Sequence, residues 1–168
     1  MPERKRIVIN TSPLISLVAA MGDLNILHFL YAEVLVPFEV SQEITAGGKD
    51  GFAVAEFEAA NWLQKKETSL SISTFLLNSL DLGEAAVIQL ALNENIKTVC
   101  IDEAVGRRIA RLNNLSLTGS IGILLQAKNS GYPLQMQPAI QRMQNRGIRL
   151  SSKVIDFALR KAGESDLS

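Results

Sequence analysis

The chain has 168 residues, of which 47 % are hydrophobic and 5 % aromatic, and its formal net charge is zero. This length predicts a single domain over residues 1–168 with a Leu-, Ile-, Val- and Ala-rich core, and one cysteine, Cys100, excludes an internal disulfide framework. Residues 10–13 interrupt the first apolar run and no run reaches the roughly 18 residues of a membrane span, so we expect a cytoplasmic protein without membrane segments.

Short β-branched runs alternate with helical patterns along the chain. Strands are predicted at residues 6–9, 34–36, 98–101 and 115–117, and residues 62–64 lead toward a weak strand. Helices are predicted from Pro13 to near Gly22, at 24–29, from Pro37, at 54–62, after Asp81, and at 103–112, 121–128, 136–145 and 151–162. This alternation is typical of an α/β fold whose mainly parallel sheet is covered on both faces. The handedness of the crossovers then brings the strand ends to a common edge.

Polar side chains stand at two strand ends and near two helix starts. Asn10 ends the first predicted strand and Asp102 ends the fourth, whereas Glu43 and Glu84 lie in the helices after Pro37 and Asp81. In a doubly wound sheet, strand ends and helix starts share the edge at which ligands bind. Because clustered carboxylates repel each other, such a cluster indicates a hard divalent cation.

Each of these four residues also has a purely structural interpretation. Asp102 can cap the helix that follows it, and Glu84 stands three residues after Asp81, at the spacing of a capping box. Glu43 can be an ordinary exposed helix glutamate, and Asn10 is a good turn residue. Position in the sequence leaves both interpretations open.

The zero net charge conceals an uneven distribution. Residues 1–103 hold 7 Lys/Arg and 14 Asp/Glu, a balance of −7, whereas residues 104–168 hold 10 Lys/Arg and 3 Asp/Glu, a balance of +7. The first part can hold a cation, and the second can meet a phosphate backbone. Solvated helix faces would give the same counts, because charges grouped along a chain need not form one surface.

Five motifs follow one another in the sequence. They are Asn-Thr-Ser-Pro-Leu-Ile at 10–15, Val-Pro-x-x-Val-x-x-Glu-Ile at 36–44, Leu-Gly-Glu-Ala at 82–85, Ile-Asp-Glu-x-x-Gly-Arg-x-x-Ala at 101–110, and Thr-Gly-Ser-Ile-Gly-Ile-Leu-Leu-Gln-Ala-Lys at 118–128. Together they resemble the PIN-domain nucleases, most closely a bacterial and archaeal subgroup of VapC-like toxins long catalogued as a domain of unknown function. The resemblance covers about residues 6–163 and implies a PIN-like three-layer α/β/α sandwich with a mainly parallel central sheet.

The resemblance also implies which residues act. Glu43, Glu84 and Asp102 match metal-binding acids of the family, and Asn10 stands where most PIN domains carry Asp. With Asn10 they form the expected catalytic and metal-binding set for Mg²⁺ or Mn²⁺. An amide oxygen can bind such a cation but supplies no charge, so we expect weaker cation binding than at a site of four carboxylates.

A second set of residues is expected to bind the substrate. Arg107 matches the Gly-Arg of the fourth motif, and Ser120 matches a polar residue that the family places beside its last acid. Arg107 can equally form a surface salt bridge, since such pairs are common on helices. The full expected set is Arg107, Arg108, Arg111, Ser120 and Lys128.

The function implied by the resemblance is a metal-dependent endoribonuclease, the toxin of a type II toxin–antitoxin pair. Its implied partners are RNA, a small antitoxin protein that covers the acidic edge, and a second copy in a homodimer. The lone His28 excludes a two-histidine ribonuclease and a zinc site built on clustered His and Cys. Because Asn10 removes one charge, a catalytically weak PIN-like binding or regulatory module is the alternative, and cation binding distinguishes the two.

Overall fold

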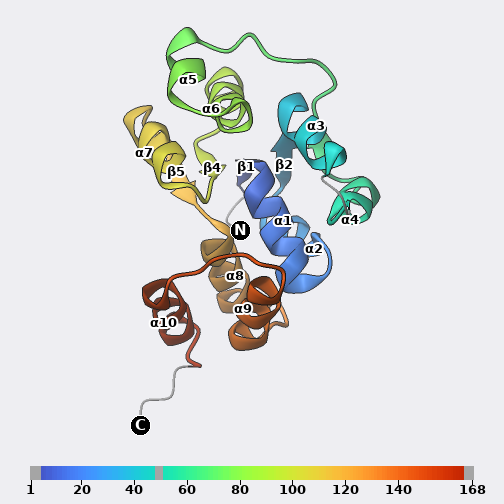
Figure 1. Cartoon of the computed structure of the whole chain (residues 1–168), viewed down its shortest axis with the longest axis vertical. Helices are drawn as coiled ribbons and strands as arrows, with labels where there is room; N and C mark the ends of the chain where they lie inside the picture. Colours follow the sequence, from blue (N-terminus) through green and yellow to red (C-terminus); the bar gives the residue numbers. More distant parts are fainter. Residues whose placement is uncertain (1–4, 48–50, 165–168) are drawn as a thin grey trace.

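The protein is described from a computed structural model that covers residues 5–47 and 51–164 (Figure 1). The strands are β1 (Arg6–Ile9), β2 (Glu33–Val36), β3 (Gln64–Lys65), β4 (Thr98–Cys100) and β5 (Ser116–Thr118). The helices are α1 (Thr11–Met21), α2 (Asn25–Leu30), α3 (Phe38–Ala46), α4 (Val54–Ala59), α5 (Thr74–Ser79), α6 (Leu82–Glu94), α7 (Ala104–Leu112), α8 (Ser120–Asn129), α9 (Met136–Asn145) and α10 (Ser152–Lys161).

The strands form one all-parallel sheet in the order β3-β2-β1-β4-β5. In Figure 1 they lie between α5 and α6 on one side and α8, α9 and α10 on the other. Ile7, Val8 and Ile9 of the central strand β1 are fully buried, as expected of a parallel strand that helices cover on both faces. The predicted three-layer α/β/α sandwich is therefore confirmed.

The direction of winding reverses at β1. The chain runs outward from β1 through β2 to β3, and then crosses to β4 on the other side of β1 and continues to β5. The backbone N–H of Asn10 donates to the Cys100 carbonyl at 3.1 Å, so β1 and β4 end side by side. In open α/β sheets, ligands bind outside the strand ends at such a reversal.

Local capping explains where several helices begin and end. The Asp81 carboxylate accepts a hydrogen bond from the Glu84 backbone N–H at 2.9 Å, which confirms the predicted start of α6. Helix α1 ends as predicted at Gly22, whose φ of 82° favours glycine. Within the two described ranges, no helix is long and apolar enough to cross a lipid bilayer.

Two local differences from the sequence expectation concern residues 54–79. The predicted helix 54–62 ends at Ala59, and the following strand β3 comprises Gln64–Lys65 because it pairs with β2 in that register. Helix α5 was not expected. The Ser73 hydroxyl accepts a hydrogen bond from the Leu76 backbone N–H at 3.3 Å, and the buried Leu76 gives this short helix its packing contact.

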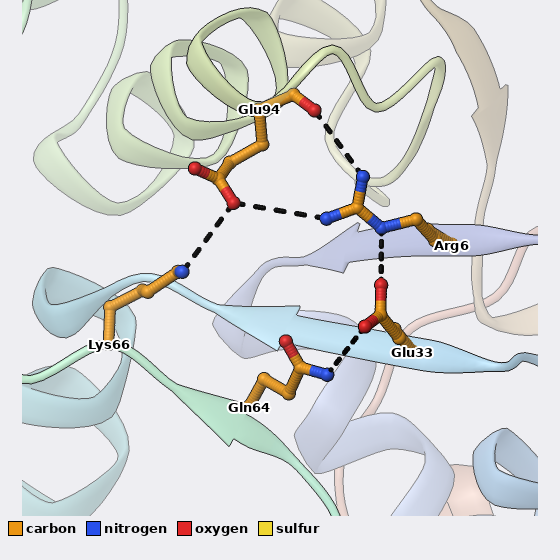
Figure 2. A network of polar contacts seen from close by, with 5 residues as sticks. All are labelled: Arg6, Glu33, Gln64, Lys66 and Glu94. Carbon is orange, nitrogen blue, oxygen red and sulfur yellow. Dashed lines mark hydrogen bonds and ion pairs between the residues drawn. The ribbon is translucent and has the colours of Figure 1, made fainter.

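The sheet edge at which β1 and β2 begin carries paired charges (Figure 2). Arg6 forms an ion pair with Glu33, and Glu94 lies 3.8 Å from Arg6 and 3.6 Å from Lys66. Gln64 donates to the other Glu33 oxygen at 3.0 Å. Because these side chains are partly exposed, each pair contributes little stability. Their charges nevertheless largely balance, unlike those at the opposite edge.

Candidate active site

Asn10 stands at the end of β1 and is almost wholly buried, with 4 % of its surface exposed. It is the N-cap residue of α1, yet its side chain makes no capping hydrogen bond. Its Oδ1 is buried and has no hydrogen-bond partner among the described residues. A buried acceptor without a partner is costly, so the cap and turn interpretation does not account for this amide.

Asn10 and Glu43 meet over Gly83, at the start of α6. A Cβ atom built on Gly83 would lie 2.1 Å from Glu43 Oε1 and 3.2 Å from Asn10 Oδ1. Partial burial and the negative charge of Asp81 raise the pKa of Glu43, and the Thr11 hydroxyl opposes this rise. The fold therefore brings an amide oxygen and a carboxylate from separate elements to one point beside Gly83.

Glu84 follows Gly83 and is 5 % exposed. Its Oε2 atom is buried without a described hydrogen-bond partner and lies against Gly106 of α7. Burial raises the pKa of Glu84 to about 7, and interactions with the Asp81 carboxyl and the charge of Glu103 add to the rise. Its backbone N–H completes the cap of α6. A cap does not require the side-chain carboxyl group to be buried near the acids Asp81 and Glu103.

Asp102 is held by Ser120 rather than by the helix that follows it. Its Oδ1 accepts from the Ser120 backbone N–H at 2.8 Å, and its Oδ2 accepts from the Ser120 hydroxyl at 3.0 Å. The N-cap residue of α7 is Glu103, so the capping interpretation of Asp102 is wrong. Burial raises the pKa of Asp102, although both Ser120 hydrogen bonds and the nearby Arg107 charge oppose the rise.

Arg107 belongs to the same group as Asp102. Its Nη1 donates to the Ile101 carbonyl at 2.8 Å, and a Cβ on Gly119 would lie 3.0 Å from this nitrogen and 2.7 Å from Asp102 Oδ1. The guanidinium thus stands at the end of β4 and makes no described ion pair within 4 Å. The salt-bridge interpretation of Arg107 is not supported.

Three glycines that sequence reasoning passed over make room for the acids. Gly83 lies against Glu43, Gly106 against Glu84, and Gly119 against Asp102, each closer than a side chain would allow. None of the three needs a positive φ, so they serve close approach and not an unusual backbone conformation. Each of these glycines lies inside one of the five sequence motifs, and this position was the sequence signal that could have identified it.

We expect Gly83→Ala to impair the site without unfolding the protein. The new methyl group would overlap Glu43 Oε1 and must displace a partly exposed carboxylate, which can move by about 1 Å. A displacement of this size at a reacting centre can reduce activity about 10²-fold. The measurement is nuclease activity together with Mn²⁺ affinity. Gly131→Ala, which strains a backbone with a φ of 94° far from the acids, controls for a loss of stability alone. Equal activity of Gly83→Ala and wild type would contradict the packing argument.

The predicted substrate-binding residues do not form one group. Arg108 and Arg111 are exposed on α7, and Ser120 lies at the start of α8. Lys128 lies near the opposite end of α8, where it pairs with Glu164, so the structure does not bring Lys128 to the acids. Another basic residue of the C-terminal part, Arg142, is also bound to a different part of the fold, because its side chain donates to the Ala20 carbonyl at 2.6 Å.

The oxygen atoms of Asn10, Glu43, Glu84 and Asp102 are suitable ligands for a hard cation, although the four side chains do not all lie in one cluster. Among residues 5–47 and 51–164, no three His, Cys, Asp or Glu side chains approach closely enough to form a metal-binding group. Asp102 forms a hydrogen bond with Ser120, whereas the Glu84 carboxylate lies against Gly106. No described ion pair includes Glu43, Glu84 or Asp102. Buried oxygens without donors beside unneutralised carboxylates are what Mg²⁺ or Mn²⁺ binds.

Comparison with known proteins agrees with this arrangement of strands. A family model described as a PIN domain, DUF3368, matches residues 6–164. A search among curated proteins found no match. PIN domains are generally nucleases and typically use divalent metals. This supports nuclease activity but specifies neither the metal nor the substrate. Since the matched region takes in nearly the whole chain, the protein belongs to the PIN-domain family.

Proposed function

We propose that this PIN-domain protein is a metal-dependent endoribonuclease. The observation that carries the proposal is the pair of buried oxygens, Asn10 Oδ1 and Glu84 Oε2, that have no described hydrogen-bond donor. The pKa values of Glu43 and Glu84 are raised by burial and by the negative charge of Asp81, and Glu103 adds to the rise at Glu84. A cation is the simplest group that would satisfy both the oxygens and the charges.

Asn10, Glu43, Glu84 and Asp102 would hold the Mg²⁺ or Mn²⁺. When bound, such a cation supplies a Lewis acid that neutralises charge on a phosphate and favours ionisation of water. Neighbouring residues of the chain position these side chains. Ser120 orients Asp102 through two hydrogen bonds, and Arg107, fixed by the Ile101 carbonyl, offers a cation to a phosphate at the same strand end.

Cleavage of labelled oligonucleotides tests this function. We expect internal fragments from single-stranded RNA in Mg²⁺ or Mn²⁺ and no fragments in EDTA, with DNA of the same sequence as the comparison. Asn10 supports a second candidate function, because an amide gives the cation site one negative charge less than Asp would. An intact RNA that binds the protein, with no effect of metal, would favour that alternative, the catalytically weak binding module.

We expect Asn10→Asp to tighten binding of a divalent cation. The substitution keeps the shape of the side chain and adds one negative charge next to Glu43, which should help a hard cation. Calorimetry with Mn²⁺ measures the change, and we expect about tenfold tighter binding. The control is Asn113→Asp at the end of α7, where the amide donates to the Ile109 carbonyl. Unchanged Mn²⁺ affinity in Asn10→Asp would mean that Asn10 is not a ligand.

RNA binding should depend on Arg108 and Arg111 and weaken as salt rises. Both side chains are exposed on α7, the helix that carries Gly106 and Arg107 into the site. Contacts with phosphates release counterions, so affinity falls with salt concentration. Reversing both residues to Glu should weaken binding by at least about tenfold and leave the melting temperature nearly unchanged, because exposed charges contribute little stability.

A matched double variant gives the control for this charge reversal. Lys5→Glu with Lys97→Glu changes the net charge equally, at the sheet edge where β1 and β4 begin. It should bind RNA nearly as wild type does. Equal losses in the two double variants would indicate a nonspecific effect of net charge, and no loss in either would show that α7 does not contact RNA.

We further propose that the nuclease is the cytoplasmic toxin of a type II toxin–antitoxin pair, acting as a homodimer. The support is the motif pattern of the chain together with its membership of the PIN-domain family. Expression of the wild-type chain should arrest growth, and co-expression of a small protein encoded beside it should restore growth. Arrest that persists in an Asp102→Asn variant would contradict a toxin that acts through this site.

A further inference from the structure

A pocket of about 620 Å³ opens beside Asp102, and neither Gly83 nor Glu43 lines it. Asp102, Arg107 and Ser120 form the part of its wall that belongs to the candidate active site. The opposite wall comes from the connection between α9 and α10 and from α10 itself. Figure 1 shows this connection passing across α8 to reach α10. None of the roles assigned above uses the pocket.

The wall combines apolar side chains with cations and hydroxyl groups. Its apolar members include Ile15, Ile121, Val154 and Phe157, and Phe157 keeps 46 % of its surface exposed. Polar members include Arg149 and the serines Ser12, Ser16 and Ser151. An exposed phenylalanine at the mouth of a pocket is available for stacking, whereas core phenylalanines such as Phe57 are almost fully buried.

We propose that this pocket binds the base of one unpaired RNA nucleotide adjacent to the scissile phosphate, with Phe157 as its stacking surface. The proposal rests on the proposed nuclease function and names its substrate class as single-stranded RNA. A pocket of this volume lies within the range of small-ligand sites, about 300–1,000 Å³. Aromatic side chains beside basic residues are how proteins hold unpaired bases.

Position and charge favour a nucleotide over an apolar protein side chain. A base in the pocket would place its own phosphate near Arg107 and Arg149, on a path that leads to Asp102. Lys161, whose ammonium lies 5.8 Å from the centre of the Phe157 ring, is a third cation near this ring. A base in a duplex stays stacked on its neighbours and cannot enter a side pocket, so double-stranded RNA should be a poor substrate.

The test combines Phe157 variants with RNA that lacks one base. Phe157→Leu keeps an apolar residue and removes the ring, Phe157→Tyr keeps the ring, and Phe75→Leu changes another exposed phenylalanine, on α5. Binding of a short single-stranded RNA is measured in EDTA, and its cleavage in Mn²⁺. A single abasic nucleotide is then moved along the RNA, one position at a time.

We expect Phe157→Leu to weaken binding or raise KM about tenfold, and Phe157→Tyr and Phe75→Leu to behave as wild type. One abasic position should reduce wild-type binding by a similar factor, and Phe157→Leu should be insensitive to it. If wild type binds and cleaves RNA but Phe157→Leu matches it and no abasic position matters, the base pocket is wrong while the nuclease stands. A protein side chain as the natural occupant would give that same pattern. If wild type neither binds nor cleaves RNA, the nuclease function itself fails.

Discussion

The substitution Asp102→Asn should abolish metal-dependent RNA cleavage while the protein stays folded. It removes the negative charge at the end of β4 but keeps the size of the side chain and an acceptor for the Ser120 N–H. Loss of a charged metal ligand removes several kcal/mol of transition-state stabilisation, so we expect a rate reduction of more than about 10²-fold. The rate is measured in saturating Mn²⁺, with circular dichroism to verify folding.

Glu103→Gln provides the matched control for Asp102→Asn. Glu103 is the next residue, its side chain is exposed, and this side chain acts on Glu84 through its charge. Its substitution should leave most of the activity. If Asp102→Asn cleaves RNA as fast as wild type, then Asp102 serves only to anchor Ser120 and the start of α8.

The substitution Glu84→Gln should stabilise the metal-free protein at pH 8. Folding raises the pKa of Glu84 from 4.5 to about 7, so between these pH values the folded state binds more protons than the unfolded state. The free energy of unfolding therefore falls as pH rises through this window, and the loss is complete above about pH 7. A neutral amide avoids the loss, which is on the order of 3 kcal/mol.

Thermal melts in EDTA at pH 4.5 and pH 8 measure this effect. At pH 8 we expect Glu84→Gln to melt several degrees above wild type. At pH 4.5, where the wild-type carboxyl is protonated in the folded state and about half protonated in the unfolded state, the two should nearly agree. Added Mn²⁺ should raise the melting temperature of wild type more than that of the variant. A variant that melts below wild type at pH 8 would contradict this expectation and show that the ionised Glu84 carboxylate stabilises the folded state.

Much of the fold was predictable because local signals and burial agree. The run 6–9 and the run that begins at Thr98 became β1 and β4, since the residues that follow Arg6 and Thr98 in these strands are apolar and buried, as in a parallel sheet covered on both faces. Asp81 was identifiable as a cap from its position before an Ala-rich stretch. Asn10 and Asp102 were identifiable as edge residues because each follows a buried strand.

The contacts that define the site were less predictable, because they join residues far apart in the chain. Asp102 binds Ser120 across 18 positions, and Lys128 binds Glu164 across 36. No local pattern distinguishes a lysine that pairs in this way from one that is free to meet RNA. The role of Gly83 likewise depends on Glu43, which belongs to α3, and emerges only when α3 and α6 pack together.

Glu39 illustrates the same limit within one helix. It stands four residues before Glu43 and therefore on a similar face of α3. The structure buries it, with 5 % exposed, and its Oε2 accepts from the Leu70 backbone N–H at 2.9 Å. Glu39 thus fixes the connection between β3 and α5, whereas Glu43 reaches Gly83. Two glutamates with similar sequence context have different tasks because different segments pack over them.

The location of Mn²⁺ in crystals, determined by anomalous scattering, tests the central claim most directly. We expect a peak at the end of β1 and β4, within coordination distance of Asn10 Oδ1 and Glu84 Oε2 and bounded by Glu43 and Asp102. Mn²⁺ found only at other surfaces, with both buried oxygens still lacking a partner in saturating metal, would contradict the metal site and with it the proposed nuclease.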